Sequence, residues 1–272
     1  MSNIDLALLQ KKAREIRLRL IQISNRTHTA HLASCLSAVD LVVALYLGWM
    51  NVNRENIESD DRDRFILSKG HAANLLYTIL AEIGVIPAEI LDHIGQAGGM
   101  LGEHPERMCV PGVEVASGSL GHGLPLACGI ALGARLRKQQ FDIFVLMGDG
   151  ECNEGSVWEA AMFASANNLE QITVLIDFNK WQGIGRSTEI LSIEPLKDKW
   201  KTFGWHSVEI DGHNFEEILT ALNTPGKPGC PRAIVAHTIK GKGISFMEDD
   251  NNWHYRIPTE EEVEKARIEL GL

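Results

Sequence analysis

The sequence has no apolar run long enough to cross a membrane and no recognisable export signal. Its longest nearly unbroken apolar stretch is Leu41–Met50, whereas a transmembrane helix needs about 20 apolar residues. The amino terminus places Asp5 ahead of Lys11 and Lys12. No small-residue cleavage site follows an apolar block there, so the terminus differs from a secretory signal. These absences exclude a membrane-spanning protein and predict a cytoplasmic one.

Closely spaced cysteines are also missing. The sequence has five cysteines at wide spacings and no Cys-x-x-Cys pair, which disfavours both a disulfide framework and a zinc ribbon. With 272 residues, the chain can bury a continuous core without disulfides or a structural metal. We therefore expect core packing from the cysteines, which are Cys35, Cys109, Cys128, Cys152 and Cys230.

Basic residues are in deficit, because 26 Lys and Arg stand against 36 Asp and Glu and give a formal charge of −10. This charge disfavours sequence-independent binding to nucleic acid. If the ligand is anionic, a local feature must offset the field of the protein. A bound metal ion or the amino terminus of a helix would do so.

Short apolar runs alternate with helix-like stretches in the second part of the chain. This alternation predicts an α/β fold with a doubly wound, mainly parallel sheet that carries helices on both faces. We expect a single domain over residues 1–272, with 1–115 as a helical and loop-rich portion and 116–250 as the sheet core. The predicted strands are Phe141–Met147, Ile172–Phe178, Trp205–Ile210 and Arg232–Thr238, with helices near 156–168, 194–203 and 214–222.

Apolar positions at helical spacing predict further helices outside the sheet. One of them, Ser37–Trp49, begins with Ser-x-x-Asp, a pattern that resembles a capping box. Two stretches without periodicity, 98–121 and 240–254, are predicted as binding loops. The other predicted helices are 4–24, 72–83, 124–137 and 259–270.

The segment Phe144–Gly155 says most about chemistry. An apolar strand runs directly into Gly148-Asp149-Gly150, and a helix follows. Ligands of doubly wound sheets bind beyond the carboxyl ends of the strands, where this turn would lie. The glycines let the backbone approach a phosphate, and Asp149 offers an oxygen to a divalent cation. Alone, the tripeptide is more typical of an ordinary tight turn.

A second oxygen comes from Asn179, which follows the next predicted strand. One strand-helix-strand crossover separates it from Asp149, and a right-handed connection brings both to the same sheet edge. These two oxygens, a backbone carbonyl, phosphate oxygens and water would complete the shell of Mg²⁺. The pair therefore favours a site that holds a metal and a diphosphate together.

Several motifs in order give the chain a resemblance to the amino-terminal half of transketolase, a thiamine diphosphate enzyme. The Gly148-Asp-Gly turn and Asn179 are similar to the family's thiamine diphosphate motif, and the likeness covers nearly the whole chain. It implies the thiamine-diphosphate-binding fold, here its diphosphate domain. The other matching segments are Ser34-Cys-Leu-Ser37, Asp63-Arg-Phe-Ile-Leu-Ser-Lys-Gly-His71, Ser117-Gly-Ser-Leu-Gly-His-Gly123, Glu154-Gly-Ser-Val-Trp-Glu159, Asp211-Gly-His213, Lys240-Gly-Lys-Gly243 and Trp253-His254.

The resemblance also implies roles for individual residues. The metal, Mg²⁺ or Ca²⁺ or Mn²⁺ in its place, would be bound by Asp149, Asn179 and the carbonyl of Trp181. The donor sugar's hydroxyls would face His31, Ser34 and His104, and the catalytic histidines would be His31, His104 and His254. Thiamine diphosphate would contact His71, Leu120, Gly148, Asp149, Gly150, Asn179, Ile184 and His254.

The chain departs from the family pattern around the sugar pocket. Ala30 and Leu32 flank His31 where the family usually has Gly and Pro, and His122 stands where Gln is common. Tyr255-Arg256 follow His254 where Gly-Lys is frequent. The family's aliphatic cofactor contact also comes one place late, as Ile184. The positions that we expect to line or border the donor pocket are Ala30, Leu32, His122, Tyr255 and Arg256, so the identity of the sugar stays open.

The resemblance covers only the diphosphate-binding part of a transketolase. Single-chain members continue into a pyrimidine-binding domain with a glutamate that activates the cofactor, and no residue here matches that glutamate. Such a carboxylate is needed to shift protonation of the cofactor's ring. We therefore expect the amino-terminal subunit of a split transketolase, in an α2β2 heterotetramer with a complementary carboxy-terminal subunit. The pair would move a two-carbon ketol unit from a ketose, expected to be phosphorylated, to an aldose.

Two other readings stay open. The alpha subunit of a thiamine diphosphate 2-oxo-acid dehydrogenase uses the same metal chemistry but passes an acyl group to lipoyl. His71, His104 and Trp253-His254 favour the sugar enzyme over it. A non-catalytic thiamine-diphosphate-binding protein is the second reading, and it gives no reason to keep Asp149 together with Asn179.

The remaining histidines carry no comparable indication of chemistry. We expect surface or core roles for them, and a structural role for His213 in its Asp-Gly-His turn. Lys69 and Arg256 could neutralise phosphate, although a solvated side chain is the ordinary alternative for each. The other histidines of this group are His28, His93, His206 and His237.

Overall fold

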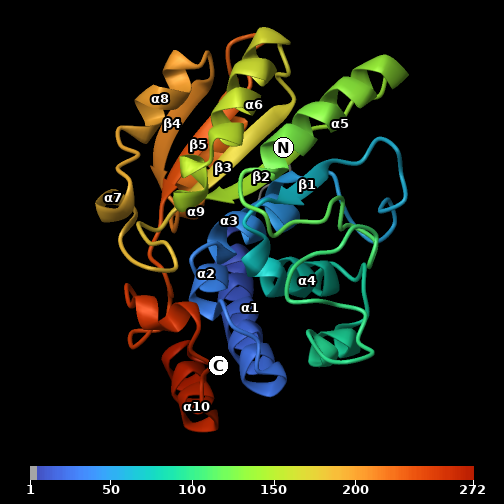
Figure 1. The fold of residues 1–272 in the computed structure, drawn as a ribbon. Helices are drawn as coiled ribbons and strands as arrows, with labels where there is room; N and C mark the ends of the chain where they lie inside the picture. The colour runs from blue at the N-terminus through green and yellow to red at the C-terminus, as the bar shows by residue number, and fades with distance from the viewer. Residues whose placement is uncertain (1–4) are drawn as a thin grey trace.

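The computed structural model describes residues 5–272, which fold around a five-stranded sheet (Figure 1). The strands are β1 (Arg64–Leu67), β2 (Ile143–Gly148), β3 (Ile172–Phe178), β4 (His206–Asp211) and β5 (Arg232–His237). Neighbouring strands are all parallel, in the order β1-β2-β3-β5-β4. The predicted α/β fold class is therefore confirmed.

Helices follow or separate the strands along the chain. The α-helices are α1 (Leu6–Thr27), α2 (Leu32–Leu36), α3 (Val39–Ala44), α4 (Ala73–Glu82), α5 (Gly123–Arg137), α6 (Gly155–Ala166), α7 (Ser187–Ile190), α8 (Leu196–Thr202), α9 (Phe215–Asn223) and α10 (Glu260–Glu269). Shorter helical segments are η1 (Leu45–Trp49), η2 (Gly70–Ala72), η3 (Ala88–His93), η4 (Gly150–Asn153) and η5 (Asn251–His254). Within residues 5–272, none of the helices is long and apolar enough to cross a bilayer.

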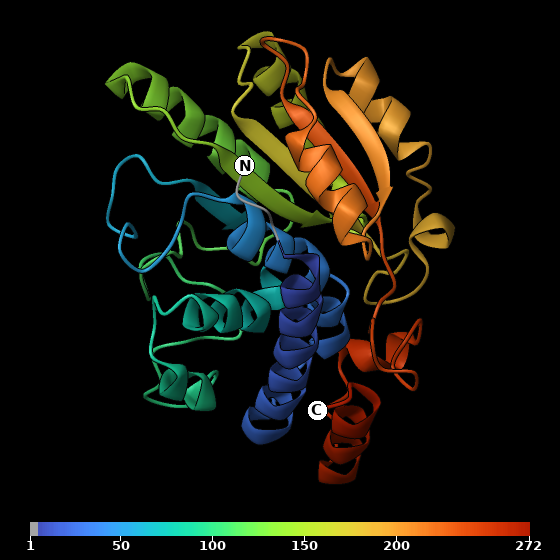
Figure 2. The same cartoon turned by 180° about the vertical axis from the view of Figure 1, so that it is seen from behind.

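Both faces of the sheet are covered, because its central strands are apolar on both sides. In β2, Val145 and Met147 enter the core shared with α5, α6 and α8. The alternate residues Phe144 and Leu146 enter the other core, with α1, α3 and α9. Figure 1 shows α5 and α6 on one face, and Figure 2 shows α9 on the opposite face.

A separate group of helices lies beyond one end of the sheet. Figures 1 and 2 both show α1, α4 and α10 there, and α1 packs against α4 and α10. The short helix α2 contacts η2, η5 and α4. The loops of this helical group consequently meet the ends of the strands, where the candidate site lies.

The sheet differs from the prediction at its first strand. Residues Arg64–Leu67 form β1 and pair with β2, so the sheet is not confined to 116–250 and begins inside the portion expected to be helices and loops. This strand is only four residues long, and a run of that length gives little alternation to detect.

The predicted capping box at Ser37 is also wrong. The residue that precedes α3 is Ala38, without a side-chain cap. The hydroxyl of Ser37 instead donates to the Asp177 carboxylate at 2.6 Å, and Asp40 pairs with Arg17. Both side chains are engaged by buried charges from distant parts of the chain, which outweighs a local cap.

Candidate active site

Asp149 and Asn179, two of the three predicted metal ligands, line the same cavity at the carboxyl edge of the sheet. Asp149 follows β2 and Asn179 follows β3. The parallel register pairs Gly148 with Asp177, and the Asp149 N–H donates to the Asp177 carbonyl at 3.3 Å. The prediction that one crossover brings Asp149 and Asn179 to the same edge is confirmed.

Asp149 is buried and incompletely paired. Asp149 is only 1% exposed, and its Oδ2 has no hydrogen-bond partner among residues 5–272. Burial raises the pKa of this carboxyl to about 6. A buried carboxylate oxygen without a partner is costly, and a bound cation would remove that cost.

The turn after β3 orients the amide of Asn179. Its Oδ1 accepts from the Trp181 N–H at 3.0 Å, and its Nδ2 donates to the Asp177 carboxylate at 3.2 Å. Lys180, between Asn179 and Trp181, has a left-handed backbone with a φ of 68°. Outside, the Trp181 ring packs under the Arg186 guanidinium at 3.7 Å.

Among residues 5–272, no group of three or more His, Cys, Asp or Glu side chains is arranged to hold a metal ion. The three predicted ligands would supply one carboxylate, one amide and one carbonyl oxygen, which are too few for Mg²⁺, an ion that takes its remaining ligands from water and substrate phosphates. The donor set therefore fits a metal that arrives together with a phosphorylated ligand.

Asp177 connects the turn to the rest of the site, and sequence reasoning missed it. Its carboxylate is fully buried and accepts from Lys69, Ser37, Thr238 and Asn179. Burial opposes ionisation, yet the Lys69 charge and these hydrogen bonds hold the pKa of Asp177 below its usual value. The available signal was a lone carboxylate inside the apolar run of β3, since buried acids are almost always paired.

Glu151 is a second missed residue. Its buried carboxylate accepts from the Ser68 hydroxyl, from the Gly121 N–H at 2.8 Å and from the Gly148 N–H at 3.3 Å. These bonds join the turn after β2 to the segment before His71 and to the loop that carries Leu120. Glu151 therefore sets the spacing of three segments that line the same cavity.

The four predicted histidines gather with His31 at their centre. The His31 ring centroid lies 5.5 Å from that of His71, 6.0 Å from His104 and 5.0 Å from His254. His31 has a left-handed backbone, with φ of 66°, and its N–H donates to the His254 carbonyl at 2.9 Å. The amino end of α2 is thereby attached to η5.

Three of these rings are neutral at physiological pH. Burial, followed by the charges of His104 and Lys240, lowers the pKa of His31 to about 4. Burial and Lys240 lower the pKa of His254 to about 3. Burial and the charge of Lys69 lower the pKa of His71 well below its usual value. Each of the three therefore has one nitrogen that accepts and one that donates a hydrogen bond.

Lys240 fixes which nitrogen of His254 carries the proton. Its ammonium lies 2.9 Å from His254 Nδ1 and donates to Asn251 Oδ1 at 2.6 Å. An ammonium group can only donate, so Nδ1 accepts and Nε2 holds the proton. Burial, with the charge of Lys69, lowers the pKa of Lys240 to about 8.

Most of the predicted site residues line one cavity of about 260 Å³. Among residues 5–272, His104 and Ile184 are predicted site residues that do not line this cavity. Ile184 is exposed. His104 nevertheless borders the cavity through its contact with His31. Those that line it are His31, Ser34, Lys69, His71, Gly118, Leu120, Gly148, Asp149, Gly150, Glu151, Asn179, Trp181, Gln182, Gly183, His254 and Tyr255.

A parallel sheet with a cavity at its carboxyl edge is typical of the class of α/β proteins that bind ligands beyond the ends of their strands. Within that class, the family described as transketolase, thiamine diphosphate binding domain, matches residues 9–272. The chain belongs to the transketolase family and carries its thiamine diphosphate binding domain.

Curated relatives of similar length are described as subunits. One subunit of the apulose-4-phosphate transketolase from Phocaeicola vulgatus is 38% identical over 97% of this chain and 94% of its own length. A 6-deoxy-6-sulfo-D-fructose transketolase subunit from a Clostridium species is 39% identical over 96% of each chain. Human transketolase is 35% identical over 92% of this chain but only 40% of its own length.

Solved transketolases share the fold. The structure from Campylobacter jejuni superimposes with a TM-score of 0.91 at 28% identity, over 98% of this chain and 43% of that chain. The structure from Pichia stipitis in complex with sedoheptulose-7-phosphate superimposes with a TM-score of 0.89 at 28% identity, over 97% of this chain and 41% of that chain. These chains are therefore more than twice as long as the part that they share with this one.

Proposed function

We propose that this chain is one subunit of a two-chain transketolase, which transfers a two-carbon ketol unit from a ketose to an aldose. The observation that carries the proposal is the cavity at the ends of β2 and β3, where Asp149 and Asn179 share a wall with His31, His71 and His254. The subunit names of relatives that match over almost their full length support the division into two chains.

The residues at the cavity fit thiamine diphosphate and a divalent cation. Asp149 would bind the metal through its unpaired oxygen, together with the Asn179 side chain and the Trp181 carbonyl. The diphosphate would lie against His71, Gly150 and His254, which line the same cavity. A Cβ at Gly148 would meet no atom within 4 Å, so space remains above the turn. When bound, the cofactor supplies the carbon that accepts and releases the ketol unit.

The chain's own residues would bind the sugar and move protons. His31 and His104 would face the donor, beside Ser34. These two histidines and His254 would move protons, because a neutral imidazole can accept a proton at one nitrogen and donate at the other. Leu120 would lie against the cofactor's rings. Ile184 remains a predicted cofactor contact, although its side chain is 86% exposed in this single chain.

We assign the activating glutamate and the recognition of the sugar's far end to a complementary carboxy-terminal subunit. With two sites at one dimer interface, the assembly would be an α2β2 heterotetramer. The donor would be a ketose with an anionic group at its far end, phosphorylated or sulfonated. A cytoplasmic location is part of the same proposal.

The experiment is reconstitution. The chain and its copurifying partner are mixed with thiamine diphosphate and Mg²⁺, and ketol transfer is measured by chromatography of sugar products. We expect transfer by the pair and none by either chain alone. Full transfer by this chain alone would reject the division into two subunits.

The same preparation separates the other two readings. Consumption of pyruvate with acyl transfer to a lipoyl group would identify a 2-oxo-acid dehydrogenase subunit. Cofactor binding by the pair without turnover of any ketose or oxo acid would identify a non-catalytic binder. Either outcome would overturn the proposal.

A further inference from the structure

The segment 238–254 carries three groups that reach the candidate site and has little regular structure of its own. Thr238 donates to the buried Asp177, Lys240 donates to His254, and His254 lines the cavity. Between β5 and η5 these residues follow turns rather than a helix or strand. Their placement therefore depends on side chains from elsewhere that hold the backbone.

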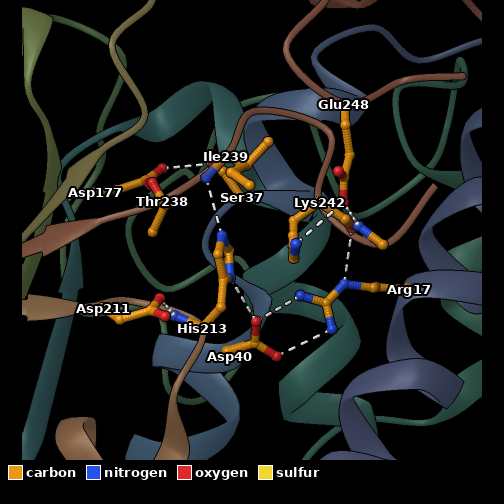
Figure 3. A network of polar contacts seen from close by, with 11 residues as sticks. Arg17, Ser37, Asp40, Asp177, Asp211, His213, Thr238, Ile239, Lys242 and Glu248 are labelled. Atoms are coloured by element: carbon orange, nitrogen blue, oxygen red, sulfur yellow. Dashed lines mark hydrogen bonds and ion pairs between the residues drawn. The ribbon is translucent and has the colours of Figure 1, made fainter. Parts of the chain in front are cut away.

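His213 holds this backbone from the turn after β4 (Figure 3). Its Nε2 accepts from the Ile239 N–H at 2.9 Å, and its Nδ1 lies 2.7 Å from Asp40 Oδ2. A backbone N–H can only donate, so Nε2 must be unprotonated and Nδ1 must carry the proton. His213 is thus neutral in this geometry, with its orientation set from both sides.

Asp40 connects His213 to Arg17, which makes a second contact with the backbone of the same segment. Arg17 donates to both oxygens of Asp40, at 3.0 and 2.7 Å, and its Nε donates to the Lys242 carbonyl at 2.9 Å. The side chains of Arg17 and Asp40 are only 7% and 6% exposed. The segment is therefore held at the Ile239 N–H and at the Lys242 carbonyl, from one buried carboxylate (Figure 3).

The backbone beside the Arg17 contact, at Lys242 and Gly243, is closely packed. A Cβ at Gly243 would lie 2.8 Å from Arg17 Cδ, and φ of Gly243 is +96°. The Gly243 N–H donates to Glu248 Oε1 at 3.0 Å, and Lys242 pairs with Glu248 at 3.2 Å. These contacts shape the turn locally, while Arg17 and His213 attach it to the body of the protein.

We propose that His213, oriented by Asp40 and Arg17, is a positioning residue that holds segment 238–254 so that Lys240 meets His254 at the cavity. Ile239 lies between Thr238 and Lys240, so its N–H is one residue away from both site contacts. The importance of His254 for turnover rests on the proposed function. The chain of contacts from Asp40 to Lys240 does not.

Two substitutions of similar size separate positioning from a structural role. His213→Gln keeps an acceptor where Nε2 lies and can still reach Ile239. His213→Asn keeps a donor where Nδ1 lies and can still satisfy Asp40, but it cannot reach Ile239. If the ring only satisfies Asp40, His213→Asn is the milder change. If the ring positions the segment, His213→Gln is the milder change.

The first measurement is kcat of the reconstituted pair, per bound cofactor. A displacement of about 1 Å at a reacting group can lower the rate about 100-fold. We expect His213→Asn to lower kcat by about 10- to 100-fold and His213→Gln by less than about 3-fold. His237→Gln is the control, because His237 lies outside this network and is half exposed. Equal rates for the two variants, or the reverse order, would overturn the proposal.

The second measurement needs neither substrate nor partner. In the full chain labelled with ¹⁵N-histidine, long-range ¹H–¹⁵N spectra report the tautomer of each ring. In the wild type we expect His213 to be protonated at Nδ1 and His254 at Nε2. In His213→Asn we expect His254 to become a mixture of its two neutral tautomers. A wild-type His213 protonated at Nε2, or an unchanged His254 in His213→Asn, would overturn the proposal. If the wild-type pair transfers no ketol unit, only the proposed function fails.

Discussion

The ammonium of Lys69 and the carboxylate of Asp177 form a salt bridge that water does not reach, with side-chain exposures of 1% and 0%. Lys69 follows β1 and Asp177 lies in β3, so the pair spans β2 between them. Lys69 also donates to the Ser34 carbonyl at 2.9 Å. One buried charge pair thereby ties α2, β1 and β3 together beneath the cavity.

Removal of one partner should be much more damaging than removal of both charges. Lys69→Met leaves Asp177 buried without its counter-ion, and the loss of such a partner costs about 3–5 kcal/mol of unfolding free energy. The double variant Lys69→Met/Asp177→Asn should regain most of that stability, because neither position then carries a charge without its partner. Urea unfolding of the free chain measures both.

An exposed lysine provides the control for this comparison. Lys265 pairs with Glu261 one helical turn away on α10, and exposed pairs contribute little. Lys265→Met should unfold at the wild-type urea concentration. A single variant Lys69→Met as stable as the wild type would mean that Asp177 does not keep its charge.

Asp149 should be essential for the metal and the cofactor. Asp149→Ala removes the unpaired buried oxygen that we assign to the cation. Loss of a partner that only supports a metal ligand costs about 10- to 100-fold in metal affinity, so we expect loss of the ligand itself to lower the affinity of the reconstituted pair for thiamine diphosphate and Mg²⁺ by at least about 100-fold. Isothermal titration calorimetry measures the change. Asp142→Ala is the control, because Asp142 lies just before β2 begins, whereas Asp149 lies just after it ends. Unchanged affinity in Asp149→Ala would place the cofactor elsewhere.

The adjacency of Asp149 and Asn179 could be predicted from the sequence because it depends only on two apolar strands and the handedness of one crossover. The partners of the buried acids could not. Ser68 and Glu151 are 83 residues apart, and Lys69 and Asp177 are 108 apart. Local patterns do not show such pairs. For the same reason, the Ser-x-x-Asp pattern predicts a capping box at Ser37, whereas its hydroxyl donates to Asp177.

Stability should fall as the pH falls below neutrality, in part because of His254. Its pKa is about 3 in the folded chain against a usual value of 6.5. Between these values the unfolded chain binds the proton and the folded chain does not, so acid favours unfolding. The contribution is complete above pH 6.5 and is lost as the pH falls toward 3.

The variant His254→Gln tests this dependence. Urea unfolding of the free chain at pH 7 and pH 5 should show a smaller loss of stability on acidification for the variant than for the wild type. His28→Asn is the control, because His28 is an exposed residue at the end of α1, and Asn tolerates its left-handed backbone. An identical pH dependence in His254→Gln and the wild type would contradict the assignment.

Tyr255 should limit which sugars enter the cavity. Its ring lies 5.5 Å from the His31 ring and 4.6 Å from the His254 ring, and it lines the cavity while 65% exposed. Tyr255→Gly removes this wall, so we expect KM for the preferred ketose to rise several-fold and longer ketoses to gain kcat/KM. Tyr255→Phe keeps the ring and should preserve the preference. Steady-state kinetics over a series of ketose lengths decides whether the ring contributes to selection.

Gly70 should be irreplaceable for the contact between the segment of His71 and the loop of Leu120. A Cβ at this position would lie 2.7 Å from the Gly118 nitrogen and the Ser117 carbonyl carbon, which are backbone atoms that cannot rotate away. Gly70→Ala should therefore separate the two segments. We expect cofactor binding by the pair to weaken about tenfold, which corresponds to about 1.4 kcal/mol of lost contact. Gly133→Ala is the matched control, because a Cβ there meets open space within α5 and alanine favours a helix. Calorimetry on the two variants should show weakened binding only in Gly70→Ala, and wild-type affinity there would mean that these segments can move apart without disturbing the cofactor.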